Sequence, residues 1–349
     1  MRVLHVSDRL TDRGGAYWHL LGVIAHQTET EEIHLAVGRA DDDVSAPCDV
    51  TMVAGLDARD RQPVELTELV HELRPDVVHV HNVMNPEALA QAGRIENVTK
   101  VLTVQDHRVF CPGKGKWTED GDVCSERMSA ELCTQCFADA GYYREILALT
   151  RERFGALERF RLVVLSEYMK RELALPDVHV IPPFVHGLDL AAEADGPPCI
   201  LFAGRLVESK GVLDAIEVWK RSGVEMPLVL AGTGTLRDDI EPLENVELLG
   251  WVAHERMASL YRRAAALVMP SRWQEPFGIV GLEAMTLGVP VVAWESGGIS
   301  QWHPGPLSPW GDIDALASAL RGSAGGRVTA PAGFDRELLM DRLARIYRN

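Results

Sequence analysis

The chain has 349 residues, which is enough for two domains of ordinary size. Apolar residues make up 46% of it and charged residues 25%, a balance typical of globular proteins that excludes overall disorder and collagen-like structure. With 35 Lys and Arg against 51 Asp and Glu, the formal net charge is −16. This charge argues against a nucleic-acid-binding protein and predicts no nucleic-acid partner.

No run of about 18 apolar residues occurs, so the sequence predicts no transmembrane segment, and peripheral contact with a membrane is left open. Residues 1–10 are a short apolar run followed by charge, without the long apolar core of a signal peptide. We therefore expect a cytoplasmic protein whose thiols are reduced.

Short apolar runs alternate with helical patterns over the first half of the chain. Strands are predicted at 3–7, 33–37, 77–81, 101–104, 162–165 and 178–181. Helical periodicity lies between them, most clearly at 66–73 and 146–157. An apolar strand followed by an amphipathic helix, repeated several times, predicts a parallel sheet with helices on both faces.

A proline-rich segment at 182–198 interrupts this alternation and suits a linker. The alternation restarts with strands predicted at 200–203, 228–231, 246–249, 266–269 and 290–293. The sequence thus predicts two doubly wound α/β domains, residues 1–184 and 185–334, and a final helix within 335–349 that packs back on the first domain. Ligands bind such sheets outside the carboxyl ends of the strands, so unusual residues there are site candidates.

The first candidate is the loop that follows the strand at 200–203. Gly204 allows a sharp turn, and Arg205 and Lys210 place two cations beside the start of the next helix. The free N–H groups of a helix N-terminus already favour anions, so this loop suits a diphosphate. The alternative is a pair of surface cations that pair with Glu208 and Asp214.

The second candidate follows the strand at 266–269. A helix is predicted at 278–287, ended by Gly288, with Glu275 in the loop before it and Glu283 within it. Carboxylates accept hydroxyl hydrogens, and the helix start offers amides for phosphates. A nucleotide-sugar needs both. The alternative is a glutamate that stabilises the helix dipole and a second, solvated one.

The third candidate is Gly14-Gly15, between the first strand and the first helix. Glycines at this turn let the backbone approach a ligand. The pattern is not the GxGxxG of dinucleotide-binding folds, and a tight strand–helix turn is the alternative interpretation.

These segments belong to a longer series. In chain order it is Gly204-Arg205-Leu206 with Lys210-Gly211, Ala231-Gly232-Thr233-Gly234, Gly250-Trp251-Val252, Pro270-Ser271 with Glu275-Pro276-Phe277-Gly278, Glu283-Ala284-Met285, and Gly288-Val289-Pro290-Val291-Val292. The series resembles the retaining glycosyltransferases of family 4, and a looser first-domain likeness extends it over almost the whole chain. The resemblance implies the GT-B fold, two facing Rossmann-like domains with an interdomain cleft. It also implies a retaining hexosyltransferase with a nucleotide-diphosphate-sugar donor, most often a UDP-sugar.

The resemblance further implies roles for residues at the motif positions. Arg205 and Lys210 would hold the donor diphosphate and stabilise it as it leaves, so that catalysis requires no cofactor. Glu275 would bind the donor sugar, and Glu283 the ribose hydroxyls. The other donor-binding positions would be the amides of Phe277, Gly278, Ile279 and Val280 near the sugar, Gly204, Gly232, Thr233, Trp251 and Val252 around the nucleotide, and Gly14 and Gly15 against the phosphates.

The chain departs from the family pattern after the strand at 101–104. Many relatives carry a His-Asp pair there, with Cys-Pro six positions after the His, and counting back from Cys111 places Gln105 at the His position. Gln105 cannot titrate, although it can hydrogen-bond a sugar, and Asp106 or His107 is left to supply charge or polarity. The alternative for His107 is a solvated loop histidine. The resemblance then implies front-face attack, with the leaving diphosphate helping to take the acceptor proton.

Four of the six cysteines lie in one segment, at Cys111, Cys124, Cys133 and Cys136. A Cys-x-x-Cys pair with two further cysteines in a cytoplasmic chain suits a structural zinc site. A metal would also stabilise an insert at 111–136 that has little apolar content of its own. Free thiols, a disulfide and an iron–sulfur centre are the alternatives.

No motif indicates the acceptor, and a sugar, a lipid-linked glycan, a small metabolite and a natural-product scaffold are all open. Two functions compete with transfer: a GT-B sugar-nucleotide epimerase, and a catalytically degenerate subunit that binds sugar nucleotides. The second is suggested by Gln105. A phosphorylase is disfavoured because no pyridoxal-lysine motif is evident.

Overall fold

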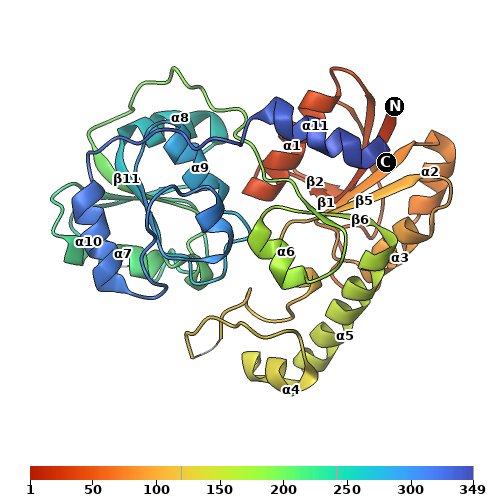
Figure 1. The fold of residues 1–349 in the computed structure, drawn as a ribbon, viewed down its shortest axis with the longest axis horizontal. Coiled ribbons are helices and arrows are strands. Elements are labelled where there is room, and N and C mark those ends of the chain that lie inside the picture. The colour runs from red at the N-terminus through yellow and green to blue at the C-terminus, as the bar shows by residue number, and fades with distance from the viewer. Residues whose placement is uncertain (119, 241–242, 349) are drawn as a thin grey trace. The chain divides into compact units, whose positions relative to one another are not determined.

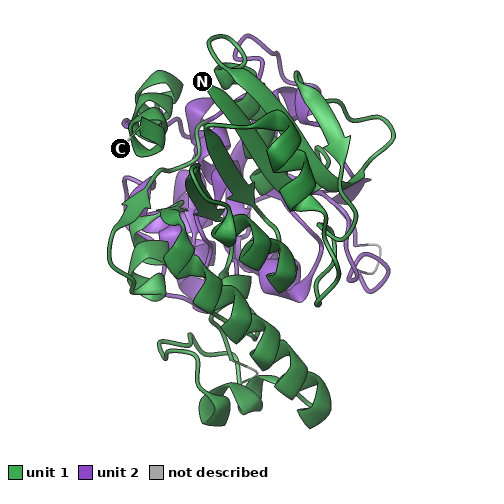
Figure 2. Ribbon diagram, turned by 90° about the vertical axis from the view of Figure 1, so that its right-hand side faces the viewer, with its two compact units in different colours: residues 1–184, 335–349 green, residues 185–334 purple. Residues whose placement is uncertain are grey.

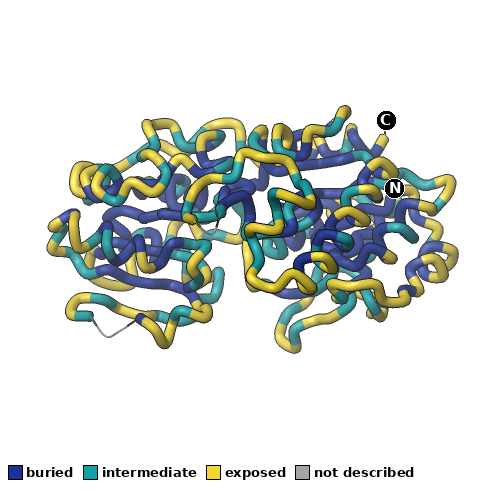
Figure 3. The backbone as a smooth tube through the Cα atoms, turned by 90° about the horizontal axis from the view of Figure 1, so that it is seen from below, coloured by how far each residue is buried: buried dark blue, intermediate teal, exposed yellow. Residues whose placement is uncertain are grey.

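The computed structural model describes the chain except for residues 119, 241–242 and 349. The chain divides into two compact units, shown in different colours in Figure 2: unit 1 is Met1–Phe184 with Asp335–Asn349, and unit 2 is Val185–Phe334. In each unit most strand residues are buried, while exposed residues lie mainly in loops and on helices, and Figure 3 colours each residue by its burial. No described helix is both long and apolar enough to cross a membrane.

Among its described residues, unit 1 contains a seven-stranded parallel sheet in the order β3-β2-β1-β4-β5-β6-β7 (Figure 1). The strands are β1 (Arg2–Leu10), β2 (Glu32–Ala40), β3 (Asp49–Met52), β4 (Val77–His81), β5 (Thr99–Val104), β6 (Arg161–Val164) and β7 (Val178–Val180). Six of these match predicted strands to within a few residues. β3 was not predicted, because all four of its residues are exposed at the sheet edge and form no apolar run.

Helices cover both faces of this sheet. The helices of unit 1 are α1 (Gly15–Gln27), α2 (Leu66–Leu73), α3 (Pro86–Arg94), α4 (Ala130–Cys133), α5 (Ala140–Ala156), α6 (Glu167–Leu173) and α11 (Arg336–Arg348). α2, α3 and α6 pack on one face, together with the end of α5. α1 and α11 pack on the other, where Leu339 and Leu343 of α11 join Val3 and Val77 of the sheet.

Unit 2 is smaller, and its described residues include a five-stranded parallel sheet in the order β10-β9-β8-β11-β12. The strands are β8 (Cys199–Ala203), β9 (Leu228–Ala231), β10 (Val246–Gly250), β11 (Ala264–Met269) and β12 (Val291–Ala293), and the helices are α7 (Val212–Ser222), α8 (His254–Arg263), α9 (Ile279–Thr286) and α10 (Ile313–Ser323). α7 and α10 share one apolar cluster on the sheet, with Val212, Ile216 and Leu316 among its members.

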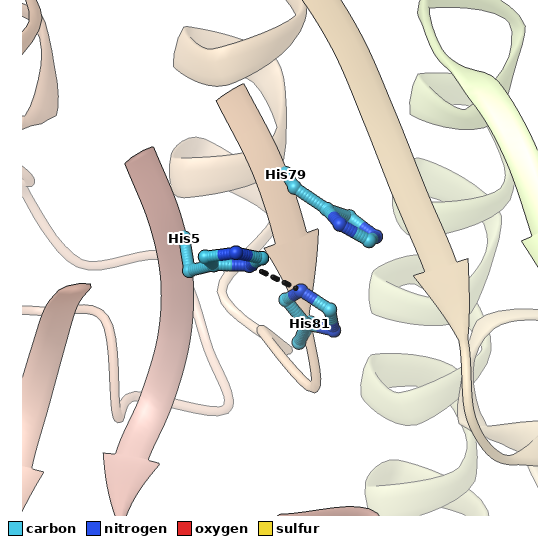
Figure 4. Close-up of side chains that lie close together, drawn as sticks. All are labelled: His5, His79 and His81. Atoms are coloured by element: carbon cyan, nitrogen blue, oxygen red, sulfur yellow. Dashed lines mark hydrogen bonds between the residues drawn. The ribbon is translucent and has the colours of Figure 1, made fainter. Parts of the chain in front are cut away.

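Three histidines lie side by side in the core of unit 1 (Figure 4). His5 on β1 and His79 and His81 on β4 are at most 3% exposed. Burial lowers the pKa of all three rings, that of His5 to about 4. The three rings are therefore neutral at pH 7.

Hydrogen bonds determine which nitrogen of each ring carries the proton. His5 Nε2 lies 2.7 Å from Gln27 Oε1, which only accepts, so His5 Nδ1 is the acceptor for His81 Nε2 at 3.0 Å. Gln27 Nε2 donates to the Tyr347 hydroxyl at 3.3 Å, and that hydroxyl donates to His79 Nδ1 at 2.6 Å. An uncharged chain of donors and acceptors thus joins α1, β1 and β4 to α11.

Candidate functional site

The strand order of unit 2 reverses next to β8. β9 and β10 follow β8 on one side, whereas β11 pairs with β8 on the other side. In an open α/β sheet this reversal is where ligands bind, outside the carboxyl ends of the strands. The loops after β8 and β11, residues 204–211 and 270–278, therefore meet at the position expected of a binding site.

Backbone hydrogen bonds stack the three loops that follow β8, β9 and β10. Gly204 N donates to Ala231 O at 2.9 Å, and Gly232 N donates to Gly250 O at 2.7 Å. Beyond this stack, Thr233 and Trp251 are exposed, and the Trp251 side chain is 43% exposed. A flat aromatic surface thus lies at the end of β10, where the sequence predicts contact with the nucleotide base.

Gly232 has no room for a side chain. Its φ is +146°, and a Cβ there would lie 1.9 Å from Gly204 O. We expect Gly232→Ala to lower the free energy of unfolding of unit 2 by more than about 2 kcal/mol, because clash adds to backbone strain. Gly223 is the matched control: its φ is +68°, but nothing lies within 4 Å of a Cβ there. Urea denaturation of both variants is the measurement, and an equal loss in the two would contradict the close approach of the loops.

Lys210 and Glu275 form an ion pair at the meeting point of the loops. Lys210 Nζ donates to Glu275 Oε1 at 2.6 Å, and Ser271 Oγ donates to the same oxygen at 2.6 Å. Burial would raise the pKa of Glu275, which is 3% exposed, but Lys210 and these hydrogen bonds lower it below its usual value. Burial lowers the pKa of Lys210, and Glu275 opposes that change. The pair is charged on both sides at neutral pH.

The two predicted cations share the ring of Trp273. Lys210 Nζ lies 4.4 Å from the ring centroid, and Arg205 Cζ lies 5.9 Å from it. The alternative partners expected from the sequence are not used by Lys210. It pairs with Glu275, and Asp214 instead binds Arg272 through two hydrogen bonds of 2.6 and 2.7 Å. The structure thus brings Arg205, Lys210 and Glu275 together.

Glu283 lies on α9 just over one turn from its start and is 5% exposed. The alternative of a solvated glutamate is therefore wrong. Burial raises the pKa of Glu283 to about 7, although Tyr261 Oη, which donates to Glu283 Oε2 at 2.7 Å, lowers it in part. Tyr261 was not predicted, because in the sequence it looks like an apolar core residue of α8.

The amides predicted to face the sugar lie at the start of α9. The helix begins at Ile279 after Gly278, whose φ is +85°. The first amides of a helix have no partner within it. Phe277 itself is buried, and its carbonyl accepts a hydrogen bond of 2.6 Å from Trp302 Nε1. Val280 is partly exposed, and so is Val252, which lies in the loop after β10.

In unit 1, Gln105 follows β5 and is 6% exposed. Three buried side-chain atoms have no hydrogen-bond partner among the described residues: Gln105 Nε2, Gln105 Oε1 and Asn82 Nδ2. Both side chains line a cavity of about 10 Å³, with room for about one water molecule, at the carboxyl ends of β4 and β5. The polar groups in it are suited to binding a hydroxyl.

The two residues after Gln105 face different surroundings. Asp106 pairs with Arg108, with an Nε–Oδ2 distance of 2.7 Å, and its pKa lies below its usual value because this pairing outweighs burial. His107 is 2% exposed and contacts Phe110 and Tyr168. The alternative of a solvated loop histidine is therefore wrong.

Asp8 is a candidate that the sequence analysis missed. It lies near the carboxyl end of β1 and accepts a 3.0 Å hydrogen bond from Tyr17 Oη on α1. Burial raises its pKa to about 6, against the effect of Tyr17 and Arg108. The sequence does contain a signal that could have identified Asp8, namely an acidic residue directly after an apolar strand. Gly14, with φ +113°, directly precedes α1, and Gly14 and Gly15 are both exposed.

The predicted metal ligands do not form a compact group of thiols. A metal site needs at least three His, Cys, Asp or Glu ligand atoms close together. Among the described residues, the group whose ligand atoms lie within 4.8 Å of one another is His5, His79 and His81. Both nitrogens of His5 and of His79 have hydrogen-bond partners, so this group is a hydrogen-bonded core. The four cysteines 111, 124, 133 and 136 are partly buried.

The larger part of unit 2 matches a known protein family. Residues 197–323 match the family described as glycosyl transferases group 1. Glycogen synthase of Mycobacterium tuberculosis is 28% identical over 272 residues, which cover 71% of this chain and 60% of that protein. The chain thus spans less than two thirds of the length of this curated relative.

Solved structures share the fold over nearly the whole chain. Sucrose-phosphate synthase of Thermosynechococcus elongatus matches with a TM-score of 0.72 at 17% identity, over 99% of this chain and 98% of that one. HepE of Anabaena, solved in complex with UDP-glucose, matches with a TM-score of 0.67 at 16% identity and the same coverage. The fold is therefore of the GT-B class, with two Rossmann-like units of parallel strands.

Proposed function

We propose that this chain is a retaining glycosyltransferase that transfers a hexosyl group from a UDP-sugar to a hydroxyl-bearing acceptor. The observation that carries the proposal is the group formed by Arg205, Lys210 and Glu275 at the strand-order reversal of unit 2. It lies within the part of the chain that matches glycosyl transferases group 1. UDP as the donor nucleotide is supported by the structure of HepE with UDP-glucose.

The donor would be held by opposite charges and hydroxyl contacts. Lys210 has three N–H donors, so it can bind a phosphate oxygen while it keeps its bond to Glu275. Arg205 is exposed on the same aromatic ring and supplies the second charge. As the bond to the sugar breaks, negative charge grows on the diphosphate, and these cations stabilise it. With two cations in place, the proposed reaction requires no metal.

Two carboxylates would recognise the hydroxyls. Glu275 is ionised and accepts hydrogen bonds from Lys210 and Ser271 through Oε1 and a further one from Trp273, and its carboxylate would also accept from a sugar hydroxyl. Glu283, with a pKa of about 7, is partly ionised at neutral pH and would accept from the ribose. Trp251 offers its exposed ring to the base.

Unit 1 would bind the acceptor, as its polar strand ends suggest. Gln105 and Asn82 offer amide groups, and Asp8 and Asp106 offer carboxylates. Gln105 has no proton to exchange at physiological pH, so we assign proton removal to the leaving diphosphate in a front-face attack. Retention of anomeric configuration follows from this geometry of attack.

The test has two stages. Unfolding temperature is first measured with UDP, GDP, ADP and dTDP, and the nucleotide that raises it most identifies the donor class; we expect UDP. Transfer from the matching UDP-sugar to a mixture of sugars, lipid-linked glycans and natural-product scaffolds is then followed by mass spectrometry, with NMR for the anomeric configuration. Binding of UDP without transfer to any acceptor would support a degenerate subunit. Interconversion of the donor alone would support an epimerase, and an inverted product would contradict retention.

A further inference from the structure

The segment 111–136 of unit 1 is poorly supplied with apolar contacts. Its helix α4 has four residues, none of them buried. Among its described residues, an antiparallel bridge joins Trp117 and Val123, and the Trp117 side chain is buried at 3% exposure. Little hydrophobic burial is thus available to stabilise its fold.

Two of the four cysteines of this segment, Cys111 and Cys136, lie close to Gly113. A Cβ at Gly113 would lie 3.2 Å from Cys136 Sγ and 3.9 Å from Cys111 Sγ. Cys133 ends α4 directly before the turn Thr134–Cys136, and its thiol lies within electrostatic range of the Cys111 and Cys124 thiols. All four cysteines are partly buried. Residues that are far apart in the sequence thus bring the Cys111 and Cys136 thiols to one place, with Cys133 on the adjoining turn.

A buried cation stands beside these thiols. Lys116 is 5% exposed, has a φ of +67°, and forms an ion pair of 2.8 Å with Glu172 on α6. Its carbonyl accepts a hydrogen bond of 2.9 Å from Cys124 N, which holds Lys116 beside one of these cysteines. Thiolates, not thiols, bind metals, and a neighbouring ammonium favours the thiolate form. The surroundings are thus suited to a negatively charged cluster.

We propose that Cys111, Cys124, Cys133 and Cys136 bind one structural zinc ion. Four thiolates at a Zn–S distance of about 2.3 Å in a tetrahedron place their sulfurs about 3.8 Å apart. No three of the four thiols lie within 4.8 Å of one another in the part of the chain that is described, so coordination requires side-chain rotation. A change of one χ1 rotamer moves a Cys Sγ by roughly 3 Å, which is enough.

Zinc binding balances in charge. Each thiol loses its proton on coordination, so four protons are released for one Zn²⁺, and the cluster carries two negative charges. Lys116 lies next to it and offsets one of them. No electron is exchanged, since zinc has no redox chemistry. The ion would fix the segment to α6 through the Lys116–Glu172 pair, and so supply the folding free energy that apolar burial does not.

The test uses the full chain, purified under reducing conditions without added chelator. Elemental analysis should find about one zinc per chain, and removal of the metal should lower the unfolding temperature of unit 1 by more than about 5 °C, restored by added Zn²⁺. Cobalt in place of zinc should give the intense visible absorption of a tetrahedral thiolate site. Cys124→Ser should lose the metal, whereas Cys48→Ser, a partly buried cysteine of unit 1 outside the segment, should keep it.

Several results would overturn the zinc site. One is a metal-free protein of unchanged stability with four reactive thiols. A disulfide among the four cysteines in non-reducing mass spectrometry is another, and iron with acid-labile sulfide is a third. If Cys124→Ser does not fold, metal removal from the unaltered chain and the cobalt spectrum still test whether the zinc site exists. UDP binding measured on the same samples separates this outcome from the proposed function, because Arg205, Lys210 and Glu275 belong to unit 2.

Discussion

Lys210→Ala should lower kcat/KM for sugar transfer by about 100- to 1,000-fold, the usual loss when one charge-stabilising group is removed from a transition state. Lys210 is placed to oppose the charge that develops on the leaving diphosphate, and Arg205 remains to bind part of it. The loss should appear mainly in kcat, because this charge is fully developed only as the bond breaks. Steady-state kinetics with a UDP-sugar is the measurement.

Stability needs its own control in this experiment. Removal of Lys210 leaves Glu275 buried without its counter-ion, which destabilises a protein by about 3–5 kcal/mol. The double variant Lys210→Ala/Glu275→Gln removes both charges, so it should recover stability while activity stays low. Lys220→Ala, an exposed lysine on α7, should leave both unchanged. Near-normal transfer by Lys210→Ala would contradict the phosphate role of Lys210.

Unit 1 should lose stability steeply as the pH falls below 6.5. The folded-state pKa values of His5, His79 and His81 lie below the unfolded value of about 6.5. The unfolded chain therefore binds more protons in acid. The stabilisation is complete above pH 6.5 and is lost as the pH falls toward the folded pKa, which for His5 is about 4. Each histidine contributes a slope of up to about 1.4 kcal/mol per pH unit.

The other titrating groups act in the opposite direction. Asp8 has a raised pKa of about 6, so it stabilises unit 1 in acid and loses that effect as the pH rises from about 4 to 6. Around the three histidines, Gln27 and Tyr347 are uncharged, His19 adds a like charge when protonated, and Glu31 lies near Tyr347. Between pH 4.5 and 6, the unfolded form of unit 1 is thus expected to bind about two protons more than the folded form, and this difference sets the slope of the free energy of unfolding with pH.

Urea denaturation at pH 7.5, 6.5 and 5.5 checks this slope, with unfolding of β1 and β4 followed by pulse hydrogen exchange. His81→Asn should reduce the slope by about one proton, because His81 is a fully buried ring. His71→Asn replaces an exposed histidine on α2 and should leave the slope unchanged. A slope that is the same in all three proteins would show that the buried rings do not control acid stability.

Much of the fold could be predicted because buried parallel strands are continuous apolar runs. β4 and β9 have the predicted bounds, and the helix predicted at 278–287 is observed at Ile279–Thr286, with Gly288 following at φ +80°. The exposed edge strand β3 could not be found in this way, since it carries no apolar pattern. A periodic pattern of apolar residues indicates which residues are buried, and a strand without buried residues has no such pattern.

The partners of the site residues were harder to predict than the residues themselves. Arg205, Lys210 and Glu275 were named from loops at strand ends, but the protein partners considered for the two cations, in the alternative interpretation, were their sequence neighbours Glu208 and Asp214. The observed partner, Glu275, is 65 residues away and becomes a neighbour because β11 pairs with β8. Sheet order is a property of the whole unit, and no local pattern states it.

Burial of polar residues was likewise not visible in the sequence. His107 looks like a loop residue, yet Phe110 and Tyr168 enclose it. The chain of bonds from His81 to Tyr347 joins residues more than 260 positions apart, so it depends on where the last helix packs. Zinc binding by the four cysteines stays a prediction.

The position of α11 has a consequence for synthesis on the ribosome. The helix follows all of unit 2 in the chain, yet its apolar side completes the core of unit 1 and its tyrosine completes the bond network there. The nascent first unit must therefore wait, with one sheet face only partly covered, until the whole second unit has emerged. We expect it to be the species that chaperones hold, and loss of residues 336–348 to harm the half of the protein that was made first.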